Sequence, residues 1–207
     1  MYLGDGFARF CNSKYSNDLG DIDNPFIHLT NVSLQKHSED YNSNHGGKWN
    51  VTNLRLFLES TRGLAATTKM FTQIDDLLVH SAKAVQNVMI NDRHCFECYG
   101  YDLLIDEELK PWLVEVNASP SLATTTVMDR DMKCSLMKDV LDIVVPDNIC
   151  TPEGGFRPPN SMGPCVDTGD FVVLYDEAAE KAREEDRLNV GKSDSGRPIR
   201  SSGRSWK

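Results

Sequence analysis

Two short apolar runs, residues 98–105 and 111–116, constrain this chain more than any other feature, and a polar segment at 106–110 separates them. Runs of this length, rich in aromatic and branched residues, are typical of the two strands of a β-hairpin. Each run holds one acidic residue, Asp102 or Glu115, and the second run leads directly into Asn117. A carboxylate inside an apolar run is costly unless it is paired or used, so the hairpin is where we expect a site.

The register of this hairpin decides whether the two acids meet. Side chains alternate along a strand, so Glu115 and Asn117 share one face. A hairpin centred on Glu108 and Leu109 places Asp102 directly opposite Glu115. A loop of two or four residues gives this pairing, whereas a loop of three residues would put the acids on opposite faces. Opposed residues have Cβ atoms roughly 4.5–5.5 Å apart, and like charges there are destabilising.

Two carboxylates and an amide carbonyl on one face require a compensating cation. Hard oxygen ligands of this kind suit Mg²⁺, which usually takes one or two carboxylates together with substrate phosphates. The residues therefore predict a magnesium site at Asp102, Glu115 and Asn117. The alternative is that one acid faces solvent and Asn117 only begins a turn.

The composition describes an ordinary soluble globular chain of 207 residues, with 40% hydrophobic and 26% charged residues. No run approaches the roughly 18 apolar residues of a membrane span, and the first residues have no signal-peptide pattern. We therefore expect no membrane partner and six cysteines that stay reduced. The net charge of −9 argues against nucleic acid as a partner.

Two other groups of metal-binding residue types are weaker candidates. Cys95 and Cys98 form a Cys-x-x-Cys pair, but a structural zinc site needs four ligands and a strand would point the two thiols to opposite faces. The polar stretch 35–50 holds His37 and His45 and is expected to be an ordered loop or lid. A metal site there and a solvated loop with two histidines are both open.

The remaining elements follow from turn residues and apolar periodicity. Residues 1–11 predict a strand, a Gly-Asp-Gly turn and a second strand, and residues 25–32 predict an extended segment. The other expected elements are helices at 52–63, from 67 or 68 to about 90, and at 127–144, a last strand or extended docking segment at 171–175, and a charged helix at 177–187.

Several separated motifs agree with a known family in order and spacing. They are Asp-Gly-Phe-Ala-Arg-Phe at 5–10, His-Leu-Thr-Asn at 28–31, His-Gly-Gly-Lys-Trp at 45–49, Cys-Phe-Glu-Cys-Tyr-Gly-Tyr-Asp at 95–102 and Leu-Val-Glu-Val-Asn-Ala-Ser-Pro-Ser at 113–121. Over residues 1–146 the chain resembles the tubulin tyrosine ligase-like family, whose members are ATP-grasp ligases. Leu-Glu-Ser-Thr-Arg-Gly at 58–63 and Leu-Tyr-Asp-Glu at 174–177 most resemble the polyglutamylase subgroup that supplies the catalytic subunit of a multi-subunit tubulin polyglutamylase complex.

This resemblance implies an ATP-dependent ligase with Mg²⁺ as its metal. A tubulin tail glutamate would be activated as an acyl phosphate and attacked by the amino group of free glutamate. Implied partners are tubulin and its acidic tails, microtubules, free glutamate and non-catalytic partner subunits. The implied location is the cytoplasm and cytoskeleton, including the cilium or basal body. Glycine in place of glutamate, and α- against β-tubulin as the target, remain open.

The resemblance also assigns roles to individual residues. Asp102, Glu115 and Asn117 would bind Mg²⁺, and Arg9 would contact the transferring phosphate or the acyl phosphate. Lys48 is a weaker candidate for holding a glutamate carboxylate. The implied nucleotide contacts are His28, Leu29, Thr30, Asn31 and Val114.

The implied fold is α+β, an antiparallel sheet with packed helices that forms the C-terminal part of an ATP-grasp fold. Residues 1–146 would be this partial catalytic domain, 147–186 an extended linker and docking segment, and 187–207 a basic disordered tail. The family's nucleotide-clamping lysines precede the point matched by Met1, so we expect little ligase activity from the isolated chain. The alternative function is a non-catalytic module that binds tubulin or the subunits of a complex, with the basic tail assisting.

Overall fold

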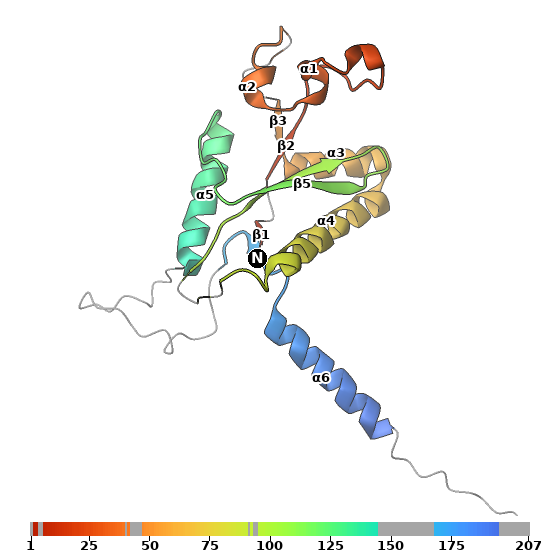
Figure 1. Ribbon diagram of the computed structural model, residues 1–207, viewed down its shortest axis with the longest axis vertical. Coiled ribbons are helices and arrows are strands. Elements are labelled where there is room, and N and C mark those ends of the chain that lie inside the picture. The colour runs from red at the N-terminus through yellow and green to blue at the C-terminus, as the bar shows by residue number, and fades with distance from the viewer. Residues whose placement is uncertain are drawn as a thin grey trace, which may run out of the picture. The chain divides into compact units, whose positions relative to one another are not determined.

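The computed structural model describes residues 2–3, 6–39, 41, 47–90, 92, 95–144 and 168–194, and it has an α+β architecture (Figure 1). The strands are β1 Tyr2–Leu3, β2 Phe7–Arg9, β3 Lys48–Asn50, β4 Gly100–Ile105, β5 Pro111–Asn117 and β6 Phe171–Val172. The helices are the 3₁₀ turn η1 Leu19–Asp21, α1 Pro25–His28, α2 Val32–Gln35, α3 Val51–Arg62, α4 Leu64–Val85, α5 Val127–Val144 and α6 Glu177–Asp194.

Strand pairing in the described residues is antiparallel throughout and differs from the expectation at the N-terminus. The pairs are β1 with β6, β2 with β3, and β4 with β5. The predicted hairpin within residues 1–11 is wrong, because β1 and β2 pair with strands distant in sequence and not with each other. Arg9 lies opposite Lys48 in the β2–β3 ladder. The Phe10 N–H then donates to the Gly47 carbonyl at 3.0 Å and lengthens the pairing by one residue.

The extended segment predicted at 25–32 is also wrong, because two short helices replace it. Asn24 caps α1 by accepting the Phe26 N–H at 3.0 Å, and Pro25 occupies the first helical position, where its fixed φ favours a helix. The backbone is extended at Leu29 and at Asn31, in the connection between α1 and α2. The capping pair Asn-Pro outweighed the strand-like apolar pattern that follows it.

The central helices were predicted correctly, with shifted boundaries. Asn50 caps α3 through the Asn53 N–H, two residues before the Thr52 cap that the sequence suggested. Gly63 ends α3 at φ +87°, as expected, and α4 begins immediately after it. The helix α4 ends at Val85, and Met89 and the residues before it form a turn.

A small core lies among the helices and the β4–β5 hairpin. Its buried apolar side chains in the described residues are Ile27, Leu58, Met70 and Val140. The helix α4 packs against α3 and against β5, and its Ser81 hydroxyl lies 3.4 Å from the Tyr101 hydroxyl of β4. The predicted apolar stripe of α4 therefore faces the core at its N-terminal end, whereas Val85 and Val88 are exposed.

The helix α5 has the predicted bounds and carries a buried carboxylate, Asp139, on its C-terminal half. Asp139 Oδ2 accepts the Asp170 N–H at 3.0 Å, so the turn before β6 is fixed to this helix. Within the same turn Gly169 has φ +54°, and a Cβ on it would overlap the Asp139 carboxyl group. In the segment 171–175, predicted as a last strand or a docking segment, the first two residues form β6, which pairs with β1.

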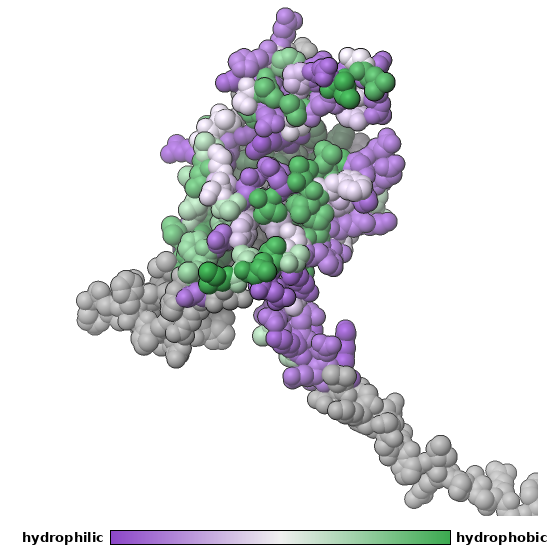
Figure 2. Space-filling view, viewed as in Figure 1, coloured by the Kyte–Doolittle hydropathy of each residue, from purple (hydrophilic) through white to green (hydrophobic). Residues whose placement is uncertain are grey.

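The chain divides into two units, residues 1–172 and 173–207. The second contains α6, which is longer than the predicted 177–187 and includes residues 187–194 of the predicted disordered tail. Its described side chains are exposed and mainly hydrophilic (Figure 2), and ion pairs such as Lys181–Glu177 join successive turns. The glycine- and proline-rich stretch 151–163 lies outside the described residues, and the domain limits at 146 and 186 stay predictions.

None of the helices in the described residues is both long enough and apolar enough for a transmembrane segment.

The turn at Gly169 gives a stability prediction. Gly169→Ala should lower the free energy of unfolding by about 1–3 kcal/mol, because it adds left-handed strain and displaces the Asp139 carboxyl group. Gly20→Ala is the matched control, since its Cβ would meet Asp18 at an ordinary 3.5 Å. Urea unfolding of both variants measures the difference, and equal effects would contradict the assigned role of the turn.

Candidate active site

The predicted pairing of Asp102 with Glu115 is present in the β4–β5 hairpin. The loop that produces it differs from the even-numbered loops expected. The Asp106 N–H donates to the Lys110 carbonyl at 3.1 Å, which closes a three-residue loop, and Leu109 adopts φ +61° within it. A type I turn followed by a left-handed residue is the usual form of such a loop.

A β-bulge restores the register that this loop would have shifted. Leu103 pairs with Leu113 and Asp102 pairs with Glu115, so Val114 has no partner on β4. One extra residue on one strand moves all later side chains to the other face. The acids therefore meet because an odd loop and a bulge compensate each other. Val114, a predicted nucleotide contact, stands at the bulge with 65% of its surface exposed.

The face that carries the acids is open and partly apolar. Leu104 and Trp112 form the next direct pair on the same face, and both are exposed. In Figure 2 apolar side chains gather over the middle of the visible body, where Figure 1 places the hairpin. The opposite face, with Tyr101 and Leu103 half-buried, is the one that packs toward α4.

The environment of Asp102, which includes the facing Glu115 carboxyl, disfavours the ionised form and raises its pKa. Partial burial raises the pKa of Asp102 above its ordinary value, the Glu115 carboxyl raises it further, and the Arg9 guanidinium acts in the opposite direction. Asn117 Nδ2 donates to Glu115 Oε1 at 3.1 Å. The structure thus brings together four of the predicted site residues, Asp102, Glu115, Asn117 and, through its charge, Arg9.

His28 is the last residue of α1, and residues 29–31 form the connection from α1 to α2. The His28 ring is engaged locally, with Nε2 at 3.0 Å from the Asp21 carbonyl and the Tyr15 ring packed edge-on against it. Leu29 and Asn31 are exposed and Thr30 is half-buried. Accessible surface therefore remains at Leu29, Thr30 and Asn31, whereas the His28 ring is already in contact with other residues.

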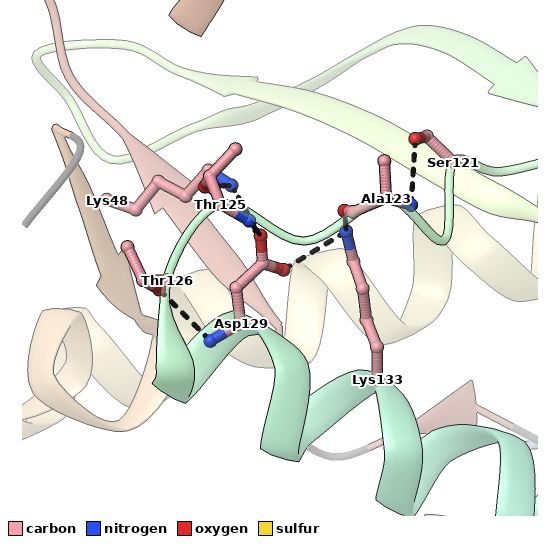
Figure 3. A network of polar contacts seen from close by, with 7 residues as sticks. All are labelled: Lys48, Ser121, Ala123, Thr125, Thr126, Asp129 and Lys133. Atoms are coloured by element: carbon pink, nitrogen blue, oxygen red, sulfur yellow. Dashed lines mark hydrogen bonds and ion pairs between the residues drawn. The ribbon is translucent and has the colours of Figure 1, made fainter.

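A buried ionic cluster, not anticipated from the sequence, lies at the start of α5 (Figure 3). Lys48 Nζ is 3.0 Å from Asp129 Oδ2 and 3.1 Å from the Thr125 hydroxyl. Lys133 Nζ is 3.0 Å from the other oxygen, Oδ1. Asp129 is fully buried and Lys48 is 7% exposed. Lys48, the weaker candidate for a glutamate carboxylate, therefore already has an anionic partner.

The same aspartate closes the helix cap. The Thr126 hydroxyl accepts the Asp129 N–H at 3.1 Å, and Asp129 Oδ2 accepts the Thr125 N–H at 3.0 Å. Burial alone would raise the pKa of Asp129, but the Thr125 N–H and the Lys48 and Lys133 ammonium groups outweigh it and lower the pKa to about 2. Asp129 is thus ionised at neutral pH and joins β3 to α5.

Part of this cluster had a signal in the sequence. The spacing Thr-x-x-Asp at 126–129 is typical of a reciprocal helix cap, and Lys133 follows Asp129 by four residues, as in helical ion pairs. The contact with Lys48 had no local signal, because 81 residues separate the partners.

The weaker metal candidates gain no support within the described residues. No three His, Cys, Asp or Glu side chains lie together there in a way that would hold a metal ion. Cys95 is exposed, Cys98 is half-buried, and both are free thiols. His45 lies outside the described residues. The set Asp102, Glu115 and Asn117 is not such a group of three, because it has two carboxylates and an amide.

Comparison with known proteins settles the family. The family model described as the tubulin-tyrosine ligase family matches residues 1–151. This chain belongs to the tubulin-tyrosine ligase family. The match covers all the predicted site residues, from Arg9 to Asn117, and the buried cluster around Asp129.

Individual members of the tubulin-tyrosine ligase family are similar over much of the chain. It is 48% identical over 176 residues to the "Probable alpha-tubulin polyglutamylase Ttll1" of Tetrahymena thermophila, which covers 85% of this chain and 42% of that protein. It is 48% identical over 140 residues to the "Probable tubulin polyglutamylase TTLL9" of Bos taurus, a match that covers 68% of this chain and 30% of that protein. The human "Tubulin polyglutamylase TTLL5" is 36% identical over 155 residues, a match that covers 68% of this chain and 12% of that protein. The chain thus spans less than half the length of each of these relatives.

The buried ion pair of this tubulin-tyrosine ligase family chain predicts a large effect from a small substitution. Asp129→Asn should lower the free energy of unfolding by about 3 kcal/mol or more, because it leaves the buried Lys48 ammonium group and the half-buried Lys133 ammonium group without their anion. Asp142→Asn is the control, since the Asp142–Lys138 pair is exposed and should contribute less than about 1 kcal/mol. Denaturant unfolding at pH 7 measures both, and similar losses would contradict the assignment.

The pKa of Asp129 also predicts an acid transition. A carboxyl whose folded pKa is lowered from 3.8 to about 2 stabilises the fold fully above pH 3.8, and the benefit is lost as pH falls toward 2. The shift corresponds to about 2 kcal/mol. The stability difference between wild type and Asp129→Asn should therefore shrink between pH 4 and pH 2, and a constant difference would contradict it.

Repulsion between the opposed acids predicts that removing one charge from the hairpin raises the free energy of unfolding instead of lowering it. In EDTA at pH 7, Asp102→Asn should raise the free energy of unfolding by a few tenths of a kcal/mol up to about 1 kcal/mol, because it removes a like-charge pair. The raised pKa of Asp102 means that the gain should vanish as acid protonates the wild-type carboxyl. A loss of stability at pH 7 would show that the pair does not repel.

Proposed function

We propose that this chain is the catalytic portion of an ATP-dependent tubulin polyglutamylase, a carboxylate–amine ligase that attaches free glutamate to a glutamate side chain in a tubulin tail. Family membership supports the general class, and the printed names of the relatives support the choice of tubulin and glutamate. The observation that carries the proposal is the opposed pair Asp102–Glu115, held on an exposed face beside the charge of Arg9.

The reaction has two steps whose atoms balance. The γ-carboxylate of the tail glutamate attacks the terminal phosphorus of ATP, so a carboxyl–phosphate bond forms and ADP leaves. The neutral amino group of free glutamate then attacks the acyl carbon, forms the isopeptide bond and releases phosphate. The amine loses its proton to solvent or to a nearby base. Both steps bring anions together, so a site for this reaction needs fixed positive charge.

The residues present fit a magnesium ion. Asp102 and Glu115 form a repelling pair whose members are exposed, and Asn117 lies against Glu115, so the donor set is of hard oxygen type. These three residues would hold Mg²⁺. When bound, the ion neutralises nucleotide phosphates and supports in-line transfer.

Arg9 is proposed to stabilise charge on the transferring phosphate and on the acyl phosphate. A guanidinium offers several N–H donors in a fixed plane, which suits phosphate and carboxylate oxygens. Its neighbour across the ladder, Lys48, is fixed by Asp129, so the strand that carries Arg9 is tied to the buried cluster. Such a rigid support favours preorganised charge stabilisation.

The nucleotide would lie between the hairpin and the connection from α1 to α2, in an ATP-grasp arrangement. His28, Leu29, Thr30, Asn31 and Val114 are the proposed contacts. Thr30 and Asn31 offer polar groups for phosphates, and the exposed Val114 offers apolar surface for the remainder of the nucleotide. His28 contributes through its backbone and its position, since its ring contacts Asp21 and Tyr15.

The proposed substrate is itself acidic, which bears on partners. A chain with net charge −9 gains nothing from general attraction to an acidic tail. We therefore propose that partner subunits or the basic residues near the C-terminus assist binding to tubulin and microtubules. Action on tubulin would place the protein in the cytoplasm at the cytoskeleton, including the axoneme or basal body of a cilium.

The test uses the purified protein at its full natural length, with any partner subunits it needs. Incubation with tubulin, ATP, Mg²⁺ and glutamate should add glutamyl residues to tubulin tails, seen by mass spectrometry. Asp102→Asn and Glu115→Gln should each reduce turnover roughly a hundredfold or more, since metal stabilisation of the transferring charge is worth several kcal/mol. Omission of ATP should abolish the reaction.

Glu107→Gln is the matched control for this experiment. Glu107 is an exposed acid in the loop of the same hairpin, so its loss changes the net charge equally without touching the proposed ligands. It should keep turnover within about twofold of the wild type. Near-normal turnover of Asp102→Asn or Glu115→Gln would refute the ligand assignment, and glycine transfer in place of glutamate would refute the proposed donor.

A further inference from the structure

Gln35, the last residue of α2, is the most deeply buried polar side chain near the proposed nucleotide contacts. It is 2% exposed, and both the oxygen and the nitrogen of its side-chain amide form hydrogen bonds. Gln35 Oε1 accepts the Asn12 N–H at 2.9 Å. Gln35 Nε2 donates to the Leu29 carbonyl at 2.6 Å and to the Phe26 carbonyl at 3.3 Å.

The contact between Gln35 and Asn12 is reciprocal. Asn12 Nδ2 donates to the Gln35 carbonyl at 3.1 Å, so two hydrogen bonds join these residues across 23 positions of sequence. Asn12 lies three residues after Arg9, on the chain that leaves β2. Gln35 therefore connects the proposed phosphate-contacting strand directly to the segment 28–31.

The position of these bonds explains why an amide is needed there. Leu29 is the C-cap of α1, and the chain runs extended from it toward α2. Carbonyl groups at the end of a helix lack partners within that helix and must find others. Gln35 satisfies two of them from a buried position, where an unpaired carbonyl would be costly. A hydrophobic side chain of the same size would fill the space but would leave these groups unpaired.

We propose that Gln35 is a positioning residue that holds residues 28–31 at a fixed place relative to Arg9. The inference rests on the proposed function for the roles of those residues, whereas the hydrogen bonds themselves do not depend on it. Gln35 touches no reacting atom in this scheme. It acts by fixing the Leu29 carbonyl and, through it, the polar groups of Thr30 and Asn31.

The experiment compares Gln35→Met with Gln86→Met in the full natural-length protein. Methionine keeps the length and most of the volume of glutamine but removes its donor and acceptor, and Gln86 is an exposed residue at the end of α4. Gln35→Met should raise KM for ATP by about tenfold or more while kcat stays within about threefold. The substitution displaces residues that bind the nucleotide and leaves the groups that contact the reacting atoms unchanged. Gln86→Met should change neither value.

Hydrogen–deuterium exchange gives the readout that a general packing defect would not reproduce. In Gln35→Met, amides of residues 26–35 should exchange faster, while those of the β4–β5 hairpin should be unchanged. Should Gln35→Met fail to fold, Asn12→Ala decides the matter, since it removes only the bond to the Gln35 carbonyl. It should show the same pattern at smaller size.

The outcomes separate this inference from the proposed function. Unchanged KM and unchanged exchange in the variants would overturn the positioning role, as would equal changes in the hairpin and in residues 26–35. If the wild-type protein modifies tubulin and the variants behave normally, the proposed function is retained and the positioning role of Gln35 is refuted. A wild-type protein that binds no ATP would refute the proposed function, and the exchange measurement would still decide whether Gln35 fixes the segment.

Discussion

A buried ion pair between Lys48 and Asp129 holds together the parts of this chain that matter for its proposed chemistry. The two residues are 81 positions apart and approach to 3.0 Å. Lys48 belongs to the ladder that carries Arg9, and Asp129 begins the helix that follows the hairpin. Because a buried charge without its partner is strongly unfavourable, neither element can move far without the other. The relative placement of Arg9 and the hairpin acids therefore depends on this contact.

The hairpin shows the opposite relation between charge and stability. Asp102 and Glu115 face each other across two strands, where like charges are destabilising, and partial burial together with the Glu115 carboxyl raises the pKa of Asp102. A bulge at Val114 is required to bring them together. A fold that keeps such a pair, at the expense of regular pairing, is well suited to binding a cation, which is how we interpret the arrangement.

Local sequence signals predicted the hairpin, the α5 bounds and the set Asp102, Glu115 and Asn117. These features depend on apolar runs, turn residues and strand alternation, which are short-range. The segment 25–32 was mispredicted because a cap at Asn24 outweighed its strand-like pattern. The pairings of β1 and β2, the contact of Lys48 with Asp129 and the contact of Gln35 with Asn12 depend on partners between 23 and about 170 residues away. No local pattern encodes such contacts, so the structure was needed to find them.

The claim that the hairpin acids form a cation platform can be tested by crystallography of the full natural-length protein with Mn²⁺ and a non-hydrolysable ATP analogue. Anomalous scattering locates the metal without reference to any mechanism. The proposal predicts a peak within coordination distance of Asp102 and Glu115 carboxylate oxygens and of the Asn117 side chain, with nucleotide phosphate oxygens completing the ligand set. A nucleotide-bound metal held by other residues, with Asp102 and Glu115 facing solvent, would contradict it.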